Sequence, residues 1–186
     1  MKYFTSDLHL GHENVIEFAE RPFSSLDEMN DTIMTKLVEP LRKNDSLYIL
    51  GDIAWNKTVM RELCARLPYG VDVFCNKGNH DSSKVLKPND KIKEVYMMKE
   101  IKIGDTRATL CHYPMKIWNE SHHNSFDLFG HIHRNETFRE FELNGKMLNV
   151  NCEFHNFAPW NEDEVIEYMK NQPDNFDAIN YESFTG

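Results

Sequence analysis

The 186-residue sequence lacks the features of membrane, exported and thiolate-metal proteins. No apolar run approaches the roughly 18 to 20 residues that a membrane span needs, and MKYFTSD reaches an acidic residue too early for a secretory signal. The cysteines form no CxxC pair; they are Cys64, Cys75, Cys111 and Cys152. We therefore expect a cytoplasmic protein with reduced, buried thiols, and neither disulfides nor a zinc ribbon.

Positive charge is also scarce, because 21 Lys and Arg stand against 30 Asp and Glu, for a formal net charge of −9. Nonspecific nucleic-acid binding depends on Lys and Arg that neutralise phosphates, so stable nucleic-acid binding is not expected. Two bound divalent cations would make the protein about four charges less negative and the site locally positive. A small anionic substrate is therefore compatible with the acidic sequence.

Length and apolar content predict a single domain over residues 1–186. Hydrophobic residues make up 40% of the chain, with twelve Phe and seven Tyr, which favours a packed core over disorder. We find no internal repeat, low-complexity tract or linker, and we expect the polar tail after about residue 172 to be loosely attached. The sequence gives no indication of the oligomeric state.

Strand-like runs alternate with helical patterns in the first half of the chain. Residues 2–6, 46–50 and 71–75 predict strands, a helical stretch over about 13–40 is split at Arg21-Pro22, and another helix spans about 58–66. Ser25, with Glu28 three residues later, predicts a helix start. This order is typical of a parallel α/β sheet, whose sites collect at the carboxyl ends of the strands.

The second half, from about residue 93, has short strand patterns separated by turns. Gly104-Asp105 and Asn144-Gly145 are hairpin signals, so we expect mostly antiparallel pairing there. An amphipathic helix is predicted from Glu162.

Five polar clusters each follow an apolar run: DLHLGH at Asp7, GDIAW at Gly51, GNHD at Gly78, HYP at His112 and GHIH at Gly130. They supply Asp, Asn and His, which suit Mn, Fe, Zn, Co or Ni better than thiolate chemistry or a calcium cage. A lone histidine beside a strand is more often a packed or surface residue than a ligand. The interpretation therefore rests on five clusters in one order and not on any single histidine.

This ordered set, DxH, GDxx, GNHD, H and GHxH, resembles the calcineurin-like metallophosphoesterase superfamily from Asp7 to about Pro159. The segments GHENVIEFAERPF, LDEMND, HYPMKIWNESHH and NVNCEFHNFAPWNEDEV are similar to its small bacterial and phage phosphoesterases. The resemblance implies an α/β fold with mixed sheets, a four-layer αββα sandwich, with a binuclear metal centre where strand ends meet.

The same resemblance implies a set of ligands for each of two metal positions. Those of the first would be Asp7, His9 and His133, those of the second Asn79, His112 and His131, and Asp52 would bridge the two. Two divalent transition-metal ions, Mn foremost with Fe, Zn, Ni or Co as alternatives, would lower the pKa of a shared water and stabilise the attacking and leaving oxygens.

The two residues after Asn79 are assigned to catalysis. His80 would face the phosphate without binding metal, and would stabilise phosphoryl charge or protonate the leaving oxygen. Asp81 is either a residue that orients it or a cap for the following SSK segment. GDIAW lacks the further acid of the GDxxD motif, so this loop offers His80 no carboxylate partner.

Five further residues are candidate substrate contacts, because similar small phosphoesterases carry comparable residues there: His12, Arg21, Trp118, His123 and His155. Arg21 and His123 would contact phosphate, and Trp118 would stack on a base. Three of them have a specific alternative reading: Trp118 as core, residues 122–123 as a solvated loop, and Arg21 as a helix end with its charge in water.

The sequence therefore predicts a metal-dependent phosphodiesterase that acts on a small, nucleotide-like phosphoester, since one domain leaves little room for a protein substrate. A phosphomonoesterase is the near alternative, and a noncatalytic metal-binding scaffold of the same fold is the rival from another class. A nuclease would need a basic strip that the sequence does not display.

Overall fold

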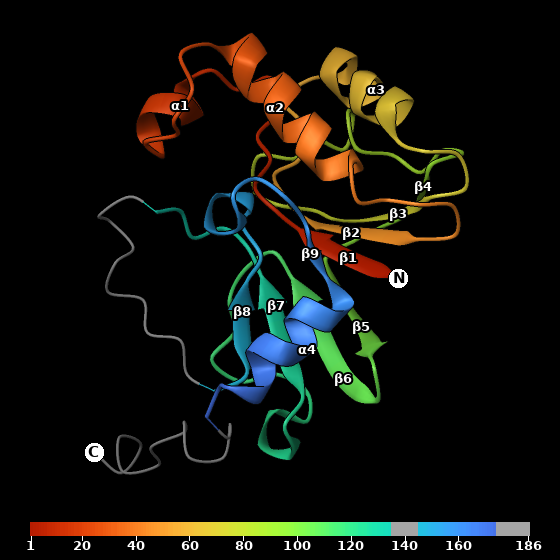
Figure 1. The fold of residues 1–186 in the computed structure, drawn as a ribbon, viewed down its shortest axis with the longest axis vertical. Helices are drawn as coiled ribbons and strands as arrows, with labels where there is room; N and C mark the ends of the chain where they lie inside the picture. Colours follow the sequence, from red (N-terminus) through yellow and green to blue (C-terminus); the bar gives the residue numbers. More distant parts are fainter. Residues whose placement is uncertain (135–144, 174–186) are drawn as a thin grey trace.

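The computed structural model describes residues 1–134 and 145–173. Two β-sheets pack against each other, and helices lie over the outer face of the first (Figure 1). The first sheet has the order β4-β3-β2-β1-β9. Its strands are β1 (Lys2–Thr5), β2 (Ser46–Leu50), β3 (Asp72–Asn76), β4 (Ile92–Tyr96) and β9 (Trp160–Asn161). The second, in the order β5-β6-β7-β8, consists of β5 (Met98–Ile103), β6 (Thr106–Cys111), β7 (Phe126–Phe129) and β8 (Met147–Asn149).

The strand directions confirm the predictions for the first sheet and correct those for the second. Strands β1 to β4 are parallel, and β9 is antiparallel to β1. The Gly104-Asp105 turn joins β5 and β6 as an antiparallel pair. However, β6, β7 and β8 are parallel, so the expectation of mostly antiparallel pairing is wrong. Long connections return the chain to the same end of the sheet. Asn144 and the tail from residue 174 lie outside the described residues.

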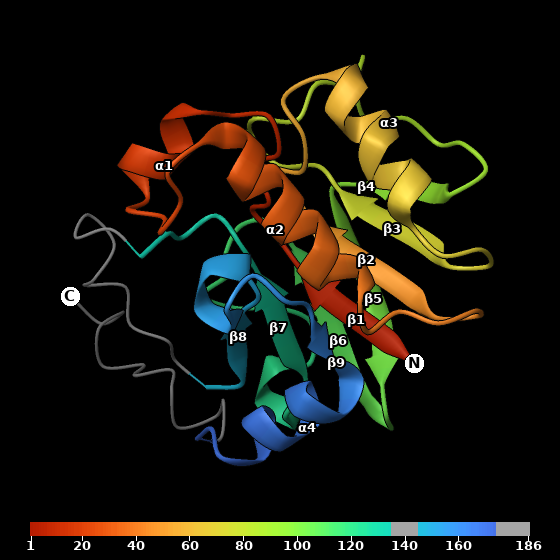
Figure 2. The same cartoon turned by 45° about the horizontal axis from the view of Figure 1, so that its top comes forward.

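The helices occupy the positions that the sequence predicts. They are α1 (Asn14–Phe18), α2 (Leu26–Val38), α3 (Lys57–Arg66) and α4 (Glu162–Lys170). The Ser25 side chain accepts a hydrogen bond from the Glu28 amide at 3.2 Å, which confirms the predicted start of α2. Helix α2 runs across the first sheet, with α3 beside it (Figure 2).

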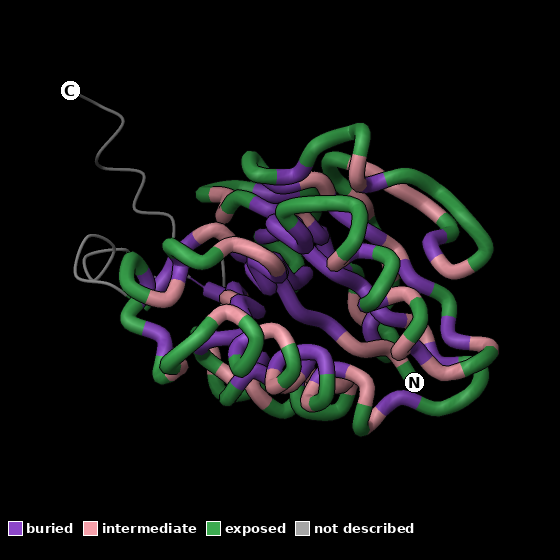
Figure 3. Tube along the Cα trace, turned by 90° about the horizontal axis from the view of Figure 1, so that it is seen from above, coloured by how far each residue is buried: buried purple, intermediate pink, exposed green. Residues whose placement is uncertain are grey.

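Successive side chains along each strand point to opposite faces of the sheet, and they contribute to two main hydrophobic cores. In β2, Leu47 and Ile49 face the helices, whereas Tyr48 and Leu50 face the second sheet. Buried segments accordingly run through the middle of the molecule (Figure 3). Helix α4 adds Val165 to the core between the sheets. The result is the predicted α/β sandwich, in which the strand ends of both sheets meet.

Two further expectations concern the cysteines and the membrane. All four cysteines are free thiols, with Cys75 and Cys152 buried and the other two partly buried. No helix in the described part of the chain is long and apolar enough to cross a membrane. The cytoplasmic location stays a prediction.

Candidate metal centre

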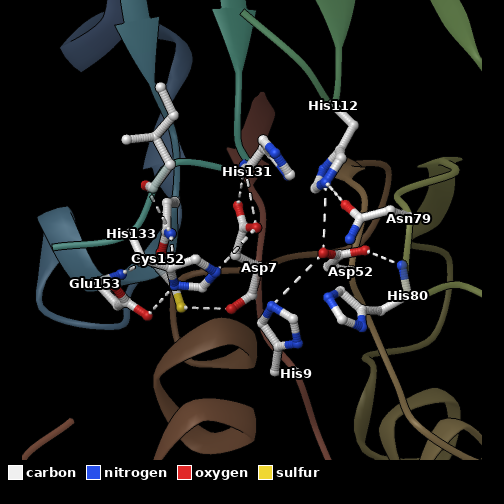
Figure 4. A network of polar contacts seen from close by, with 12 residues as sticks. Asp7, His9, Asp52, Asn79, His80, His112, His131, His133, Cys152 and Glu153 are labelled. Atoms are coloured by element: carbon white, nitrogen blue, oxygen red, sulfur yellow. Dashed lines mark hydrogen bonds and ion pairs between the residues drawn. The ribbon is translucent and has the colours of Figure 1, made fainter. Parts of the chain in front are cut away.

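Polar residues that follow five strands converge at the junction of the two sheets (Figure 4). Asp7, Asp52 and Asn79 come after β1, β2 and β3 of the first sheet. His112 and His131 follow β6 and β7 of the second sheet. Because these strands are parallel within each sheet, their carboxyl ends deliver all five residues to one place.

The potential ligands form two groups, each with its ligand atoms within 4.8 Å of one another. One contains Asp7, His9 and His133; the other contains Asp52, His112 and His131. In the first, His133 Nε2 lies 3.8 Å from Asp7 Oδ1. Asn79 extends the second, because its Oδ1 lies 3.0 Å from His112 Nε2. The two groups have the composition that the resemblance implies.

Asp52 lies between the groups. Its Oδ2 is 3.6 Å from His9 Nε2 of the first group and 3.4 Å from His112 Nε2 of the second. Its Oδ1 faces away and accepts a hydrogen bond from the His80 amide at 2.9 Å. One carboxylate oxygen thus faces ligands of both groups, as a bridging ligand requires.

Two imidazoles are prepared to bind a cation. His112 Nδ1 lies 2.8 Å from the Leu50 carbonyl oxygen, a contact that places a proton on Nδ1 and directs Nε2 into the site. His9 Nε2 is buried and has no hydrogen-bond partner among the described residues. A buried nitrogen without a partner is costly, and a cation in contact with it would remove that cost.

The charges of the site respond to burial and to one another. Burial raises the pKa of Asp7 to about 6 and lowers the pKa of His9 to about 2. Burial also acts to raise the pKa of Asp52, but the hydrogen bond and charge of His112 outweigh it and lower that pKa to about 2. At neutral pH the site therefore offers a neutral His9 and an ionised Asp52, the forms that bind metals.

The backbone at the ligands is strained. Asp7, His9, Asp52 and His131 have φ values of 54°, 49°, 52° and 69°, in the left-handed region that non-glycine residues seldom adopt. Such conformations persist where the surroundings enforce them, and they cluster at functional sites. At His131 the enforcing contact is the hydrogen bond from its amide to Asp7 Oδ2, at 2.9 Å.

Two motif glycines are required by close approach of the carboxylates. A Cβ at Gly78 would lie 2.1 Å from Asp52 Oδ1, and one at Gly130 would lie 2.4 Å from Asp7 Oδ2. Both distances are below any normal contact, so a side chain at either position would displace a ligand. This explains the glycines of GNHD and GHIH.

Sequence reasoning missed Glu153, which lies in the 3₁₀ turn η3 (Cys152–His155). Its Oε1 lies 2.7 Å from His133 Nδ1 and accepts a hydrogen bond from Arg21 Nε at 2.9 Å. A carboxylate on the far nitrogen of a metal-binding histidine fixes the orientation of the ring. A carboxylate directly between Cys152 and Phe154, in the segment NVNCEF, was the available signal.

Arg21 lies behind the site. Its side chain is 0% exposed and also donates to the carbonyl oxygens of Asp7 at 2.6 Å and Leu8 at 3.0 Å. The guanidinium thus holds the DLHLGH loop and Glu153 together. Its buried side chain leaves no exposed surface for a phosphate, and its charge does not lie in water, so the structure favours neither earlier reading of Arg21.

Asp81 holds the second group in place. Its carboxylate accepts hydrogen bonds from the amides of Asp52 at 2.8 Å, Ile53 at 3.0 Å and Gly78 at 2.9 Å. These bonds join the GDIAW loop to the GNHD loop. Asp81 therefore positions the backbone at Asp52 and Gly78, and it does not act as a cap for the SSK segment.

His80 and His12 line a cavity of about 340 Å³ in front of the two ligand groups. The His80 ring centroid lies 5.3 Å from that of His9 and 6.0 Å from that of His12. Within residues 1–134 and 145–173, no carboxylate hydrogen-bonds the His80 ring, as the missing acid of GDxxD implies.

The other candidate substrate contacts lie elsewhere. Trp118 is buried against Phe129 and donates to the Ser125 carbonyl at 3.2 Å, so it is core and not a stacking wall. His123, in the 3₁₀ turn η1 (Ser121–His123), precedes β7, whereas the site lies beyond the end of that strand. His155 stacks on Trp160 with ring centroids 4.1 Å apart.

Three exposed aromatic side chains that the sequence reasoning missed surround the histidines. Trp55 is 51% exposed and stacks on His12 with ring centroids 4.3 Å apart. Phe18 lies 5.6 Å from His133, and Tyr113 lies 4.8 Å from His131. Exposed apolar rings around a polar site provide surfaces for a planar ligand group.

Comparison with known proteins agrees with this geometry. The family model of the calcineurin-like phosphoesterases matches residues 3–180. An uncharacterised protein of Methanocaldococcus jannaschii is 30% identical over 176 residues, which cover 90% of each chain. The crystal structure of a protein of unknown function from Aquifex aeolicus aligns with a TM-score of 0.70 at 28% identity, over 90% of this chain and 98% of that one.

Proposed function

Because the chain belongs to the calcineurin-like phosphoesterases, we propose that it is a phosphodiesterase that hydrolyses a nucleotide-like ester with two divalent metal ions. Family membership and the two ligand groups support a metal-dependent phosphoesterase in general. The choice of a diester and of a nucleotide-like substrate rests on the cavity and its rim.

The position of Asp52 Oδ2 carries the proposal. It faces His9 and His112 at 3.6 and 3.4 Å, so one anionic oxygen serves both ligand groups. The oxygen and nitrogen donors, without thiolate, suit borderline divalent ions, and we propose manganese as the first candidate. Two such ions would lower the pKa of a bound water and neutralise charge on the phosphoryl oxygens.

The remaining residues of the cavity act on the ester itself. His80 is anchored through its amide to Asp52, while its ring lies on the cavity wall. From there it would protonate the leaving oxygen or stabilise a phosphoryl oxygen. His12, stacked beneath Trp55, forms the adjoining wall.

The cavity favours a diester over a monoester. Its described lining contains histidines, Asn14, Val15 and Phe18, but no Lys or Arg. A monoester brings about two negative charges at neutral pH, and beyond the two metal ions the described lining adds no Arg or Lys to bind the second charge. A diester brings one and has a second substituent that the apolar wall can hold. The exposed ring of Trp55 suits a base as that substituent.

A substrate and metal panel tests this function. Chelator-treated protein should hydrolyse a chromogenic diester poorly and recover with Mn, Ni, Co or Zn, and less well with Mg, because imidazole ligands suit borderline ions. A linear nucleotide diester or a cyclic nucleotide should be cleaved faster than the matching monoester. Higher kcat/KM for monoesters would establish the monoesterase alternative, and metal binding without turnover would establish the scaffold.

A further inference from the structure

A basic hollow of about 410 Å³ lies between α3 and the loop of residues 82–90. Four of the side chains that line it are cationic: Lys57, Arg61, Lys84 and Lys87. Asp90 is the acid in the described lining, so four positive charges and one negative charge give +3. The whole chain has a formal charge of −9. The net charge of the hollow is therefore positive, whereas that of the whole protein is negative.

In the described part of the chain, the cations of the hollow are not paired with carboxylates, unlike several others on the surface. Lys2, Arg66, Lys99 and Arg107 each pair with a carboxylate. Within residues 1–134 and 145–173, none of the four cations of the hollow forms an ion pair. Like charges gathered in a concave surface raise the local potential, so an anion that entered would be attracted by all four.

Both walls of the hollow continue from the loops of the metal centre. Lys57 follows Trp55 by two residues, and Lys84 follows Asp81 by three. Since a chain spans at most about 3.5 Å per residue, their Cα atoms lie within about 7 and 11 Å of those site residues. The hollow is therefore within reach of a substrate that extends past Trp55.

We propose that this hollow binds backbone phosphates of a single-stranded oligonucleotide whose scissile ester lies at the metal centre. The proposal rests on the proposed function and extends it from one nucleotide to several. Trp55 would stack on a base between the two, and the cations would track the backbone, the usual combination for single strands. The expectation against stable nucleic-acid binding used the whole-chain charge and the lack of a basic strip in the sequence. Neither reveals a cluster of cations that only the fold brings together.

The test compares two double charge reversals. Binding of fluorescent hexathymidylate is measured by anisotropy in a His80→Ala background, which keeps every proposed metal ligand and slows turnover. Lys84→Glu with Lys87→Glu should weaken binding at least ten-fold in low salt. Lys43→Glu with Lys102→Glu, which makes the same charge change at two exposed lysines elsewhere, should leave it within two-fold. Each lost phosphate contact should also reduce the slope of log affinity against log salt by about 0.7.

Three outcomes would overturn the proposal: no saturable binding of hexathymidylate, equal weakening by both charge reversals, or competition by tripolyphosphate at the same concentration as the oligonucleotide. The last would indicate a compact polyphosphate instead. Because binding is measured apart from turnover, a protein that cleaves small diesters yet fails here would refute the hollow alone. One that binds the oligonucleotide but cleaves no ester would refute the proposed function.

Discussion

Glu153→Gln should separate the positioning of a metal ligand from metal binding itself. Glu153 is buried between His133 Nδ1 at 2.7 Å and Arg21 Nη2 at 2.8 Å. The neutral glutamine side chain leaves the buried guanidinium of Arg21 without its anionic partner. Breaking such a pair costs about 3 to 5 kcal/mol of unfolding free energy. His133 also loses the carboxylate that orients its ring. Loss of such a partner lowers metal affinity about 10- to 100-fold.

Urea unfolding of the chelated protein and calorimetric titration with metal measure the two effects. Glu162→Gln is a matched control, since Glu162 pairs with Lys2 at 2.7 Å but is partly exposed and far along the chain from the site ligands. It should cost at most about 1 kcal/mol and leave metal affinity unchanged. The reasoning would be refuted if Glu153→Gln matched the control in both measurements, or if it weakened both metal positions equally.

Three further predictions follow from the site and the second sheet. Asp52→Ala should lose both metals and activity, whereas Asn79→Ala should mainly weaken the second; elemental analysis that finds two metals in active Asp52→Ala would disprove the bridge. His80→Ala should lower kcat about 100-fold or more while metal content and Tm stay unchanged, and the loss should shrink for good leaving groups if His80 is the acid. Burial raises the pKa of Asp127 to about 7, so its ionisation opposes folding and stability falls as pH rises from about 4 to 7. Asp127→Asn should flatten that slope and add up to about 4 kcal/mol at pH 8, measured by urea unfolding, and an unchanged slope would contradict this.

The polar clusters of the candidate metal centre could be located because each follows a strand that its own sequence specifies, whereas their assignment as ligands came from the family resemblance. SLYIL is apolar on both faces, as a central parallel strand must be, and Asp52 comes two residues after it. The carboxyl end of such a strand has a fixed position in the fold. The order of the motifs along the chain therefore indicates which polar residues lie close together in space. The same reasoning located β1 and β3, and the capping pattern of Ser25 and Glu28 located the start of α2.

Residues whose role depends on distant partners could not be predicted. Arg21 and Glu153 are 132 positions apart, and no local pattern indicates that each neutralises the other in the interior. The parallel pairing of β6, β7 and β8 was missed because hairpin signals are local, whereas a crossover is defined only by where the chain returns. Trp55 was overlooked because an exposed aromatic side chain has the same local pattern as a buried one.

Each of the two ligand groups is held in place by its own buried carboxylate, Glu153 for the first group and Asp81 for the second. Glu153 acts on the first group, through the ring of His133 and, by way of Arg21, through the backbone of Asp7. Asp81 acts on the bridge, through the amides of Asp52 and Gly78. Each network is buried and holds a ligand with left-handed backbone, at Asp7 and at Asp52. Two carboxylates join the groups: Asp52 Oδ2 faces His9 and His112, and Asp7 Oδ2 accepts a hydrogen bond from the His131 amide at 2.9 Å. A change in one network should therefore reach the other metal position through Asp52 and Asp7.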